Sequence, residues 1–181
     1  MFTTKFRAKL ISDLYGNYLG AGDCVLDVGC GNGIVDKVLK ERLKIKIIGT
    51  DIKDYRLEKF EFKTMVRPDK LPFSDNEFTW ILFNDVLHHS ENILELLREG
   101  LRVGKRLLIF EMQPSLAAGI ADVALNFFHD KGMPVPLNFL KISEWENLLG
   151  QLDCVFEIKP VRKPFWGYPL QHIFILVKTR L

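Results

Sequence analysis

The chain contains little cysteine, and its cysteines form no recognisable framework. Only Cys24, Cys30 and Cys154 occur in 181 residues, and no two of them form a C-x-x-C pair. An odd number of scattered cysteines argues against a disulfide scaffold and favours a reducing, cytoplasmic compartment. Cys30 stands between two glycines, where its small size explains it better than nucleophilic chemistry does.

An excess of one charge is missing as well, and so is a long hydrophobic run. The formal net charge is +2, which gives no reason to expect the clustered basic face of a nucleic-acid-binding protein. The longest apolar segment, 115–128, is interrupted by Asp122 and Asn126 and is shorter than the roughly 20 residues of a membrane helix. The first residues show no secretion signal. We therefore expect a cytoplasmic protein with no membrane span and no nucleic-acid partner.

Repeats, linkers and low-complexity stretches are also absent from the sequence. Hydrophobic residues make up 48% of the chain and charged residues 27%, which is ordinary for a globular protein. A length of 181 residues suits one folded unit. We expect residues 1–181 to form a single domain.

A glycine-rich turn organises the rest of the sequence. The apolar, β-branched run 25–28 leads directly into Gly29, Gly31 and Gly33, and a helical pattern begins at Ile34. A buried strand, a glycine turn and a helix in this order form the seat for a nucleotide-like cofactor in α/β folds. The spacing G-x-G-x-G differs from the usual dinucleotide fingerprint, and the Gly-Lys-Ser/Thr ending of a phosphate-binding P-loop is missing.

Two acidic residues narrow the choice of ligand. Asp27 lies inside the first strand, where an unpaired carboxylate is costly, so it either organises the glycine loop or faces a cationic ligand. The second apolar run, 45–50, ends at Asp51, which is placed to accept hydrogen bonds from both hydroxyls of a ribose. These features suit a ligand that has a ribose and a positive centre but no phosphate.

Hydrophobic periodicity predicts alternating helices and strands along the whole chain. We expect helices over 4–19, 34–43, 55–60, 91–101 (capped by Ser90), 116–128 and 142–149 (capped by Ser143). We expect strands over 25–28, 45–50, 60–66, 78–83, 106–110, 155–161 and 173–178. The pattern indicates a doubly wound α/β fold with a mostly parallel sheet and helices on both faces. The run 78–83 is apolar throughout, as in a central strand that is buried on both sides.

Polar residues gather at the ends of three predicted strands. Asp27, Asp51 and the pair Asn84-Asp85 each end a strand or closely precede its end. Ligands of open parallel sheets bind beyond the carboxyl ends of the strands, near the point where the strand order reverses. We therefore expect these side chains to converge on one rim of the sheet.

Three sequence blocks resemble the class I S-adenosylmethionine-dependent methyltransferases. The first is Asp-Val-Gly-Cys-Gly-Asn-Gly at 27–33, and the second is Asp51. The third, Leu-Pro-Phe-Ser-Asp-Asn-Glu-Phe at 71–78 with Asn-Asp-Val-Leu-His-His at 84–89, is similar to a region of the type 11 subgroup. The blocks follow one another in the family's order over 25–89.

The resemblance implies a seven-stranded sheet with its last strand antiparallel, and S-adenosylmethionine as the cofactor. It places the cofactor half at about 23–90 and the substrate side at about 91–181. The cofactor-binding residues it implies are Asp27, Gly29, Cys30, Gly31, Asn32, Gly33, Asp51, Ile52, Asp69, Asn84, Asp85 and Val86. The family's usual acidic residue at the adenine edge is replaced by Arg67-Pro68, and Pro68 has no N–H to offer. Asp69 is the candidate that takes over, unless packing alone holds the adenine.

Methyl transfer from a sulfonium needs alignment above all, so a catalytic base is optional. Of the histidines that follow the fourth strand, His88 is the preferred base, with Asp85 beside it near the methyl group. One of His88 and His89 could instead pack against, or cap, the next helix. Candidate substrate-binding residues are His89, Glu111, His129, Trp166 and Tyr168. No ligand spacing supports a metal site.

The sequence leaves three functions open. The favoured one is methyl transfer to a small, hydrophobic or ring-bearing acceptor, because aromatic residues fall in the segments that cover the acceptor site in this family. The second is a cofactor-binding or partner subunit without catalysis, which the Arg67-Pro68 departure keeps open. The third is methylation of RNA or protein, against which the lack of a basic patch and of an Asn/Asp-Pro-Pro-Tyr/Phe motif counts.

Overall fold

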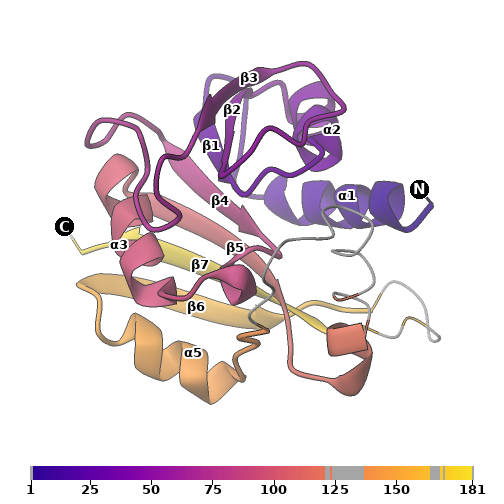
Figure 1. Cartoon of the computed structure of the whole chain (residues 1–181), viewed down its shortest axis with the longest axis vertical. Helices are drawn as coiled ribbons and strands as arrows, with labels where there is room; N and C mark the ends of the chain where they lie inside the picture. The colour runs from indigo at the N-terminus through magenta and orange to yellow at the C-terminus, as the bar shows by residue number, and fades with distance from the viewer. Residues whose placement is uncertain (1, 121–122, 124–136, 164–167, 169, 181) are drawn as a thin grey trace.

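The computed structural model describes residues 2–120, 123, 137–163, 168 and 170–180. Its centre is a seven-stranded sheet in the order β3-β2-β1-β4-β5-β7-β6 (Figure 1). The strands are β1 (Cys24–Val28), β2 (Lys46–Asp51), β3 (Glu61–Thr64), β4 (Trp80–Asn84), β5 (Arg106–Met112), β6 (Cys154–Pro160) and β7 (His172–Thr179). Strand β7 runs antiparallel to both of its neighbours, β5 and β6, and the other described strand pairs are parallel. The predicted α/β fold with an antiparallel last strand is confirmed.

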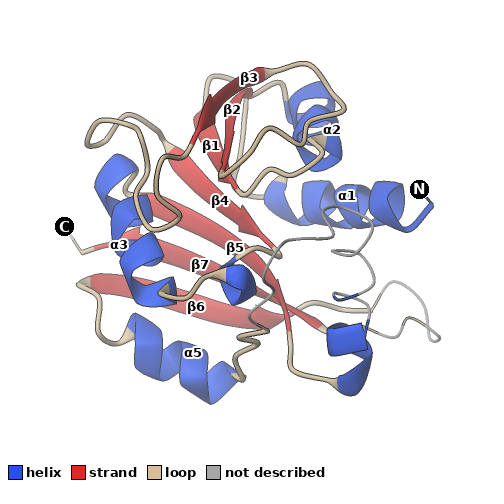
Figure 2. Ribbon diagram, in the orientation of Figure 1, coloured by secondary structure: helices blue, strands red, loops and turns tan. Residues whose placement is uncertain are grey.

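Helices cover both faces of the sheet (Figure 2). Helices α1 (Phe2–Tyr15) and α2 (Ile34–Leu43) pack on one face, in a buried cluster that includes Ile11 and Leu39. Helices α3 (Ile93–Val103) and α5 (Ile142–Leu149) cover the other face, where Leu97 and Trp145 are buried. All five residues of β4 are buried, as the apolar run predicted for a central strand.

The helix predicted over 55–60 is wrong. These residues form an irregular connection in which Leu57 N–H donates to the carbonyl of Asn32 at 3.0 Å. The Arg56 side chain donates to the Asp54 carboxylate and to the carbonyl of Phe60. Six residues form too short a helix to be stable without tertiary support, and these contacts favour the extended path.

Several predicted element ends also shift. Helix α1 ends at Tyr15 instead of residue 19, directly before Gly16. Helix α3 is capped by Asn92, whose side chain accepts from Glu95 N–H at 3.1 Å, and not by Ser90. Ser143 lies inside α5, where Glu144 reaches back to the backbone N–H of Lys141 at 2.7 Å. Of the helix expected over 116–128, residues 116–120 and 123 are helical, and the other positions lie outside the described residues.

The strand ends that could contact a ligand lie at one edge of the sheet. Strands β1, β2 and β4 are parallel neighbours, so their carboxyl ends meet at the same rim. Strand β7 runs the opposite way, and its first residue, His172, pairs with Met112 at the end of β5. The antiparallel strand therefore brings its amino end to this same rim.

Candidate functional site

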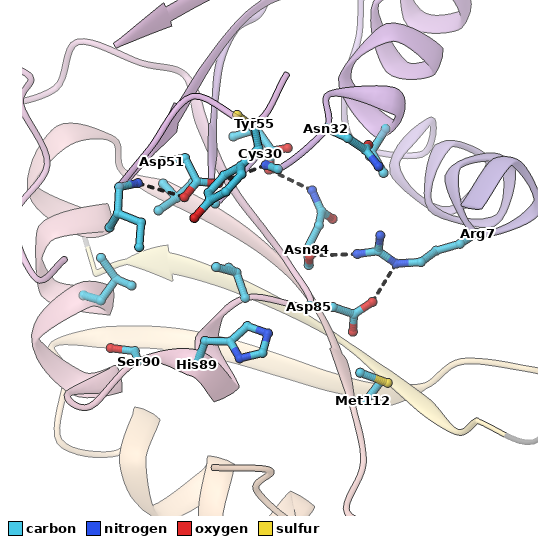
Figure 3. Close-up of a pocket in the computed structure, with 18 of the residues that line it drawn as sticks. Arg7, Cys30, Asn32, Asp51, Tyr55, Asn84, Asp85, His89, Ser90 and Met112 are labelled. Carbon is cyan, nitrogen blue, oxygen red and sulfur yellow. Dashed lines mark hydrogen bonds and ion pairs between the residues drawn. The ribbon is translucent and has the colours of Figure 1, made fainter. Parts of the chain in front are cut away.

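A cavity of about 360 Å³ opens at the carboxyl edge of the sheet (Figure 3). It is bordered by the ends of β1, β2 and β4, by α1, and by the segments that flank β7. Its lining includes most of the residues predicted for the cofactor, namely Asp27, Gly29, Cys30, Gly31, Asn32, Asp51, Ile52, Asn84, Asp85 and Val86. The structure therefore brings the predicted strand ends together around one space.

Packing within the protein, and not only access for a ligand, explains the glycines of the loop. Gly29 has φ +71°, and a Cβ placed on it would lie 2.1 Å from Cγ2 of Val86. A side chain at Gly29 would therefore push the segment after β4 away from the loop. Gly33 has φ +75° and faces the ring of Phe60, and it is not part of the cavity wall. Its glycine is explained by that contact and by its place before α2.

Asp51 ties the second strand to the glycine loop. One carboxylate oxygen accepts from Gly31 N–H at 3.0 Å, and the other accepts from Ile52 N–H at 2.8 Å. Each oxygen of an ionised carboxylate can accept more than one hydrogen bond. The side chain is held in place at the cavity wall and offers acceptors there.

A buried chain of hydrogen-bonded polar side chains runs from α1 to β1, and two of its members line the cavity. Tyr15 Oη donates to Asn84 Oδ1 at 2.8 Å, and Asn84 Nδ2 donates to Asp27 Oδ1 at 2.9 Å. Asp27 has only 1% of its surface exposed, and burial raises its pKa well above the usual range for an aspartate. Asp27 is therefore shielded from solvent, and the hydrogen bond from Asn84 holds its side chain in place.

Arg7 was not predicted from the sequence as a site residue. From α1 it donates through Nε to Asp85 Oδ2 at 2.7 Å and through Nη2 to the carbonyl of Asn84 at 2.8 Å (Figure 3). Burial by itself would raise the pKa of Asp85, but the charges of Arg7 and His172 hold that pKa below its usual range. The signal was present in the sequence, because Arg7 shares one helical stripe with the buried Ile11 and Tyr15 at spacings of four residues.

His172 is a second residue that the sequence reasoning missed. Its side chain is 3% exposed and stacks on Phe110 with ring centroids 4.4 Å apart. Its Nε2 lies 3.7 Å from Asp85 Oδ2, and the residue lines the cavity. A polar residue at the start of an apolar antiparallel strand was the available signal. Tyr55 and Met112 also line the cavity without having been predicted.

The two histidines after β4 have different surroundings. His88 is 2% exposed, and its Nδ1 lies 2.6 Å from Glu111 Oε2. The other oxygen of Glu111 accepts the backbone N–H groups of Val86 and Leu87 at 2.8 and 2.6 Å. Glu111 and His88 therefore brace the segment after β4 and do not line the cavity, whereas His89 does.

The remaining predicted residues fall into three groups. Tyr168 lines the cavity. Asp69 forms an ion pair with Arg67 at 2.8 Å and is absent from the cavity wall, to which Pro68 contributes. His129 and Trp166 lie outside the described residues. Burial raises the pKa of the Cys30 thiol, which keeps it protonated and agrees with a packing role.

Among the residues that the structure describes, no cluster of three or more His, Cys, Asp or Glu side chains is arranged to bind a metal ion. None of the described helices has the length and apolar character needed to cross a membrane.

Comparison with known proteins points to one family. Residues 26–107 match a family model described as a methyltransferase domain. The chain is 31% identical over 103 residues to the bifunctional methionine biosynthesis protein MetXA/MetW of Rhodopirellula baltica. That match covers 49% of this chain but only 16% of the relative's length.

Solved structures of low sequence identity share the fold. The YcgJ protein of Bacillus subtilis superimposes with a TM-score of 0.68 at 16% identity, covering 97% of this chain and 99% of that one. A SAM-dependent methyltransferase from Aquifex aeolicus gives a TM-score of 0.66 at 22% identity, covering 93% of this chain and 88% of that one. At these identities the likeness establishes the fold.

Proposed function

We propose that this chain is a class I S-adenosylmethionine-dependent methyltransferase and that it transfers a methyl group to a small, hydrophobic or ring-bearing acceptor; the methyltransferase family model matched by residues 26–107 and the shared fold support this. The observation that carries the proposal is the shared cavity. The ends of β1, β2 and β4 form one part of its wall, and residues from β5 and around β7 form another. A donor and an acceptor can therefore meet in one space.

The residues present suit S-adenosylmethionine. Asp51 offers carboxylate oxygens to the ribose hydroxyls, and the apolar side chains of Ile52, Tyr55 and Met65 offer packing for the adenine. Asp27 offers negative charge to the amino group of the methionine part. When bound, the cofactor supplies a methyl group that is already activated by its positively charged sulfur.

The acceptor side of the cavity is the part that does not belong to the cofactor seat. Met112, Tyr168 and Leu170 give it an apolar and aromatic wall, while Asp85 and His89 give it polar groups. A cavity of about 360 Å³ lies in the usual range for small-molecule sites, which supports a small acceptor. These residues would orient the acceptor and exclude water from it.

Some acceptors must lose a proton when they are methylated. We propose that the polar groups after β4 serve this step. Asp85 stays ionised beside Arg7 and is available to orient a donor group of the acceptor. The family resemblance implies His88 as the base, together with Asp85. Because its ring is buried against Glu111 outside the cavity wall, we propose that His88 positions the segment that carries Asp85 and His89, and that His89 binds the acceptor from the cavity wall. The bond between His88 Nδ1 and Glu111 fixes the orientation of the His88 ring.

The proposal is tested by following the methyl group. Purified protein is incubated with methyl-labelled S-adenosylmethionine and, in separate samples, with the dialysable fraction of a cell extract, with bulk RNA, or with extract protein. We expect label in a dialysable product and none in the other two samples. Label that enters only RNA or protein would replace the small acceptor by a macromolecule. Tight cofactor binding without any labelled product would identify a non-catalytic subunit, the function that the departure at Arg67-Pro68 leaves open.

A further inference from the structure

Two buried carboxyl groups lie against each other behind the cofactor cavity. Asp27, at the end of β1, is 1% exposed, and Asp36, in the first turn of α2, is fully buried. Each of the two side chains shifts the pKa of the other directly, so the carboxyl groups are close neighbours. Within the described residues neither side-chain oxygen of Asp36 has a hydrogen-bond partner. Buried oxygens without a donor are rare, so this contact needs an explanation.

A shared proton explains the contact. Two carboxylates in contact and shielded from water cannot both be ionised without strong repulsion, whereas one proton between them makes a hydrogen bond. Burial raises the pKa of Asp36 to about 7, and burial together with the neighbouring Asp36 raises the pKa of Asp27 further. Near neutral pH the pair therefore holds at least one proton and carries at most one negative charge.

The groups around the pair do not neutralise a second negative charge. Those that interact with it are Arg7 and Tyr15 from α1, Asn84 from β4 and Cys30 from the glycine loop. Arg7 is the cation in this set, and it is bound to Asp85 and to the backbone of Asn84. A second charge on the pair requires a new cation beside Asp27.

We propose that Asp36 is a positioning residue for the cofactor, because it shares a proton with Asp27 that the cationic amino group of the cofactor displaces on binding. The inference rests on the proposed seat of that amino group at Asp27. The proton leaves the carboxyl pair for the solvent, the pair changes from one negative charge to two, and the amino group keeps its charge. No bond of the cofactor is made or broken.

The sign of the pH dependence follows from this exchange. Releasing a proton becomes easier as the pH rises, so cofactor affinity rises through the range in which the free pair is still protonated. The gain is at most about tenfold per pH unit for one proton. It ends where the cofactor's own amino group begins to lose its proton, at about pH 8.

The experiment is calorimetric titration with S-adenosylhomocysteine at about pH 6.5, in two buffers whose ionisation enthalpies differ. The difference between the two heats counts the protons released. We expect the wild-type protein to release more protons per cofactor bound than Asp36→Asn, in which only Asp27 can lose one. The asparagine side chain keeps the contact with Asp27 but has no proton of its own to lose. The affinity of this variant is expected to rise less between about pH 6 and pH 7.5 than that of the wild type.

The matched control is Asp153→Asn, an exposed aspartate on the turn before β6, which is expected to release as many protons as the wild type. Equal proton release by the wild type and Asp36→Asn would overturn the proposal. If Asp36→Asn does not fold, carboxyl ¹³C NMR of the wild type decides. The Asp36 carboxyl must then titrate near neutrality in the free protein and be ionised in the complex, and an Asp36 already ionised at about pH 5.5 in the free protein would refute it. None of these readouts uses turnover, so a failure of methyl transfer leaves this result standing and is told apart from it.

Discussion

Asp85 has a backbone conformation that few residues other than glycine adopt, with φ +53°. Aspartate tolerates the left-handed region better than most residues, although at some cost. In return the carboxylate reaches Arg7 at 2.7 Å and lies 3.7 Å from Nε2 of His172. Strain of this kind persists where the surrounding contacts hold it, which is common at functional sites. At the scale of single residues, the site consists of acids whose charges are set by their neighbours.

Asp51 and Asp69 are both predicted cofactor residues, and the structure favours the first. We expect Asp51→Ala to weaken S-adenosylhomocysteine binding by about 10- to 100-fold, because it removes charged acceptors from the cavity wall. Asp69→Ala should weaken it less than about 3-fold, since that carboxylate is paired with Arg67. Isothermal titration calorimetry measures both variants, with Asp51→Asn as the isosteric control. The reverse ranking would show that Asp69 takes part in holding the adenine.

The buried carboxyl of Asp36 makes the stability of the cofactor-free protein fall as the pH rises from acid toward neutrality. A carboxyl whose pKa is raised on folding contributes stability that is fully present below its unfolded pKa and is lost by the time the pH has risen through the folded value, about 7 for Asp36. We expect the Asp36 contribution to the free energy of unfolding to fall by up to about 1.4 kcal/mol per pH unit between about pH 4 and about pH 7, and to level off above that point. Urea unfolding at a series of pH values measures it. Asp36→Asn should flatten the slope, and a slope unchanged by that substitution would contradict the assignment.

At the scale of elements, α1 is the helix that closes the cavity from the side. It packs on the sheet through Ile11 and Tyr15, and it sends Arg7 on the same stripe to the end of β4. The helix is thus joined to the site both by apolar burial and by one ion pair. The adjoining α2 starts directly after the glycine loop and contributes Asp36. Two helices on one face of the sheet therefore control the charges of the cavity.

We expect Arg7→Met to lower the free energy of unfolding by about 2 kcal/mol, because it leaves the carboxylate of Asp85 buried without its cation. Adding Asp85→Asn should restore part of that loss, since the amide carries no charge. Urea unfolding of the two single variants and the double variant gives the coupling energy. Lys9→Met, on the exposed side of the same helix, is the control and should change stability by less than about 0.5 kcal/mol. Simple additivity of the two site substitutions would mean that the ion pair contributes nothing.

At the scale of the whole molecule, the sheet is one continuous layer that joins the two predicted halves of the chain. Strand β1, from the cofactor half, pairs with β4, which pairs with β5, and β5 pairs with β7. A ligand at the ends of these strands contacts elements from both halves, so binding is coupled to the stability of the whole sheet.

Saturating S-adenosylhomocysteine, at about 100 times its dissociation constant, should stabilise the fold by about 2.7 kcal/mol. For a domain of this size the melting temperature is expected to rise by about 5 to 10 °C. Differential scanning fluorimetry measures the shift. Methylthioadenosine, which lacks the amino acid part and cannot reach Asp27, should give a smaller shift. If neither compound shifts the melting temperature, the protein does not bind this cofactor.

The sequence determined the order of strand, glycine turn and helix, and the acids at the strand ends, because these depend on local patterns of apolar residues. The central strand β4 and the clustering of Asp27, Asp51 and Asn84 at one rim were predictable for that reason. The helix expected over 55–60 failed because its residues are held by contacts with Asn32 and Phe60 that no local pattern encodes.

Only the tertiary structure decided which side chains face one another. Arg7 and Asp85 are separated by 78 positions in the chain, and the pairing of Asp27 with Asp36 depends on how α2 lies against β1. The direction of His88, away from the cavity and toward Glu111, follows from the register between β4 and β5. The local sequence sets which elements form, because periodicity and turn chemistry act over a few residues. The charge and orientation of each group in the site are set by burial and by neighbours from distant segments, which come together only when the chain folds.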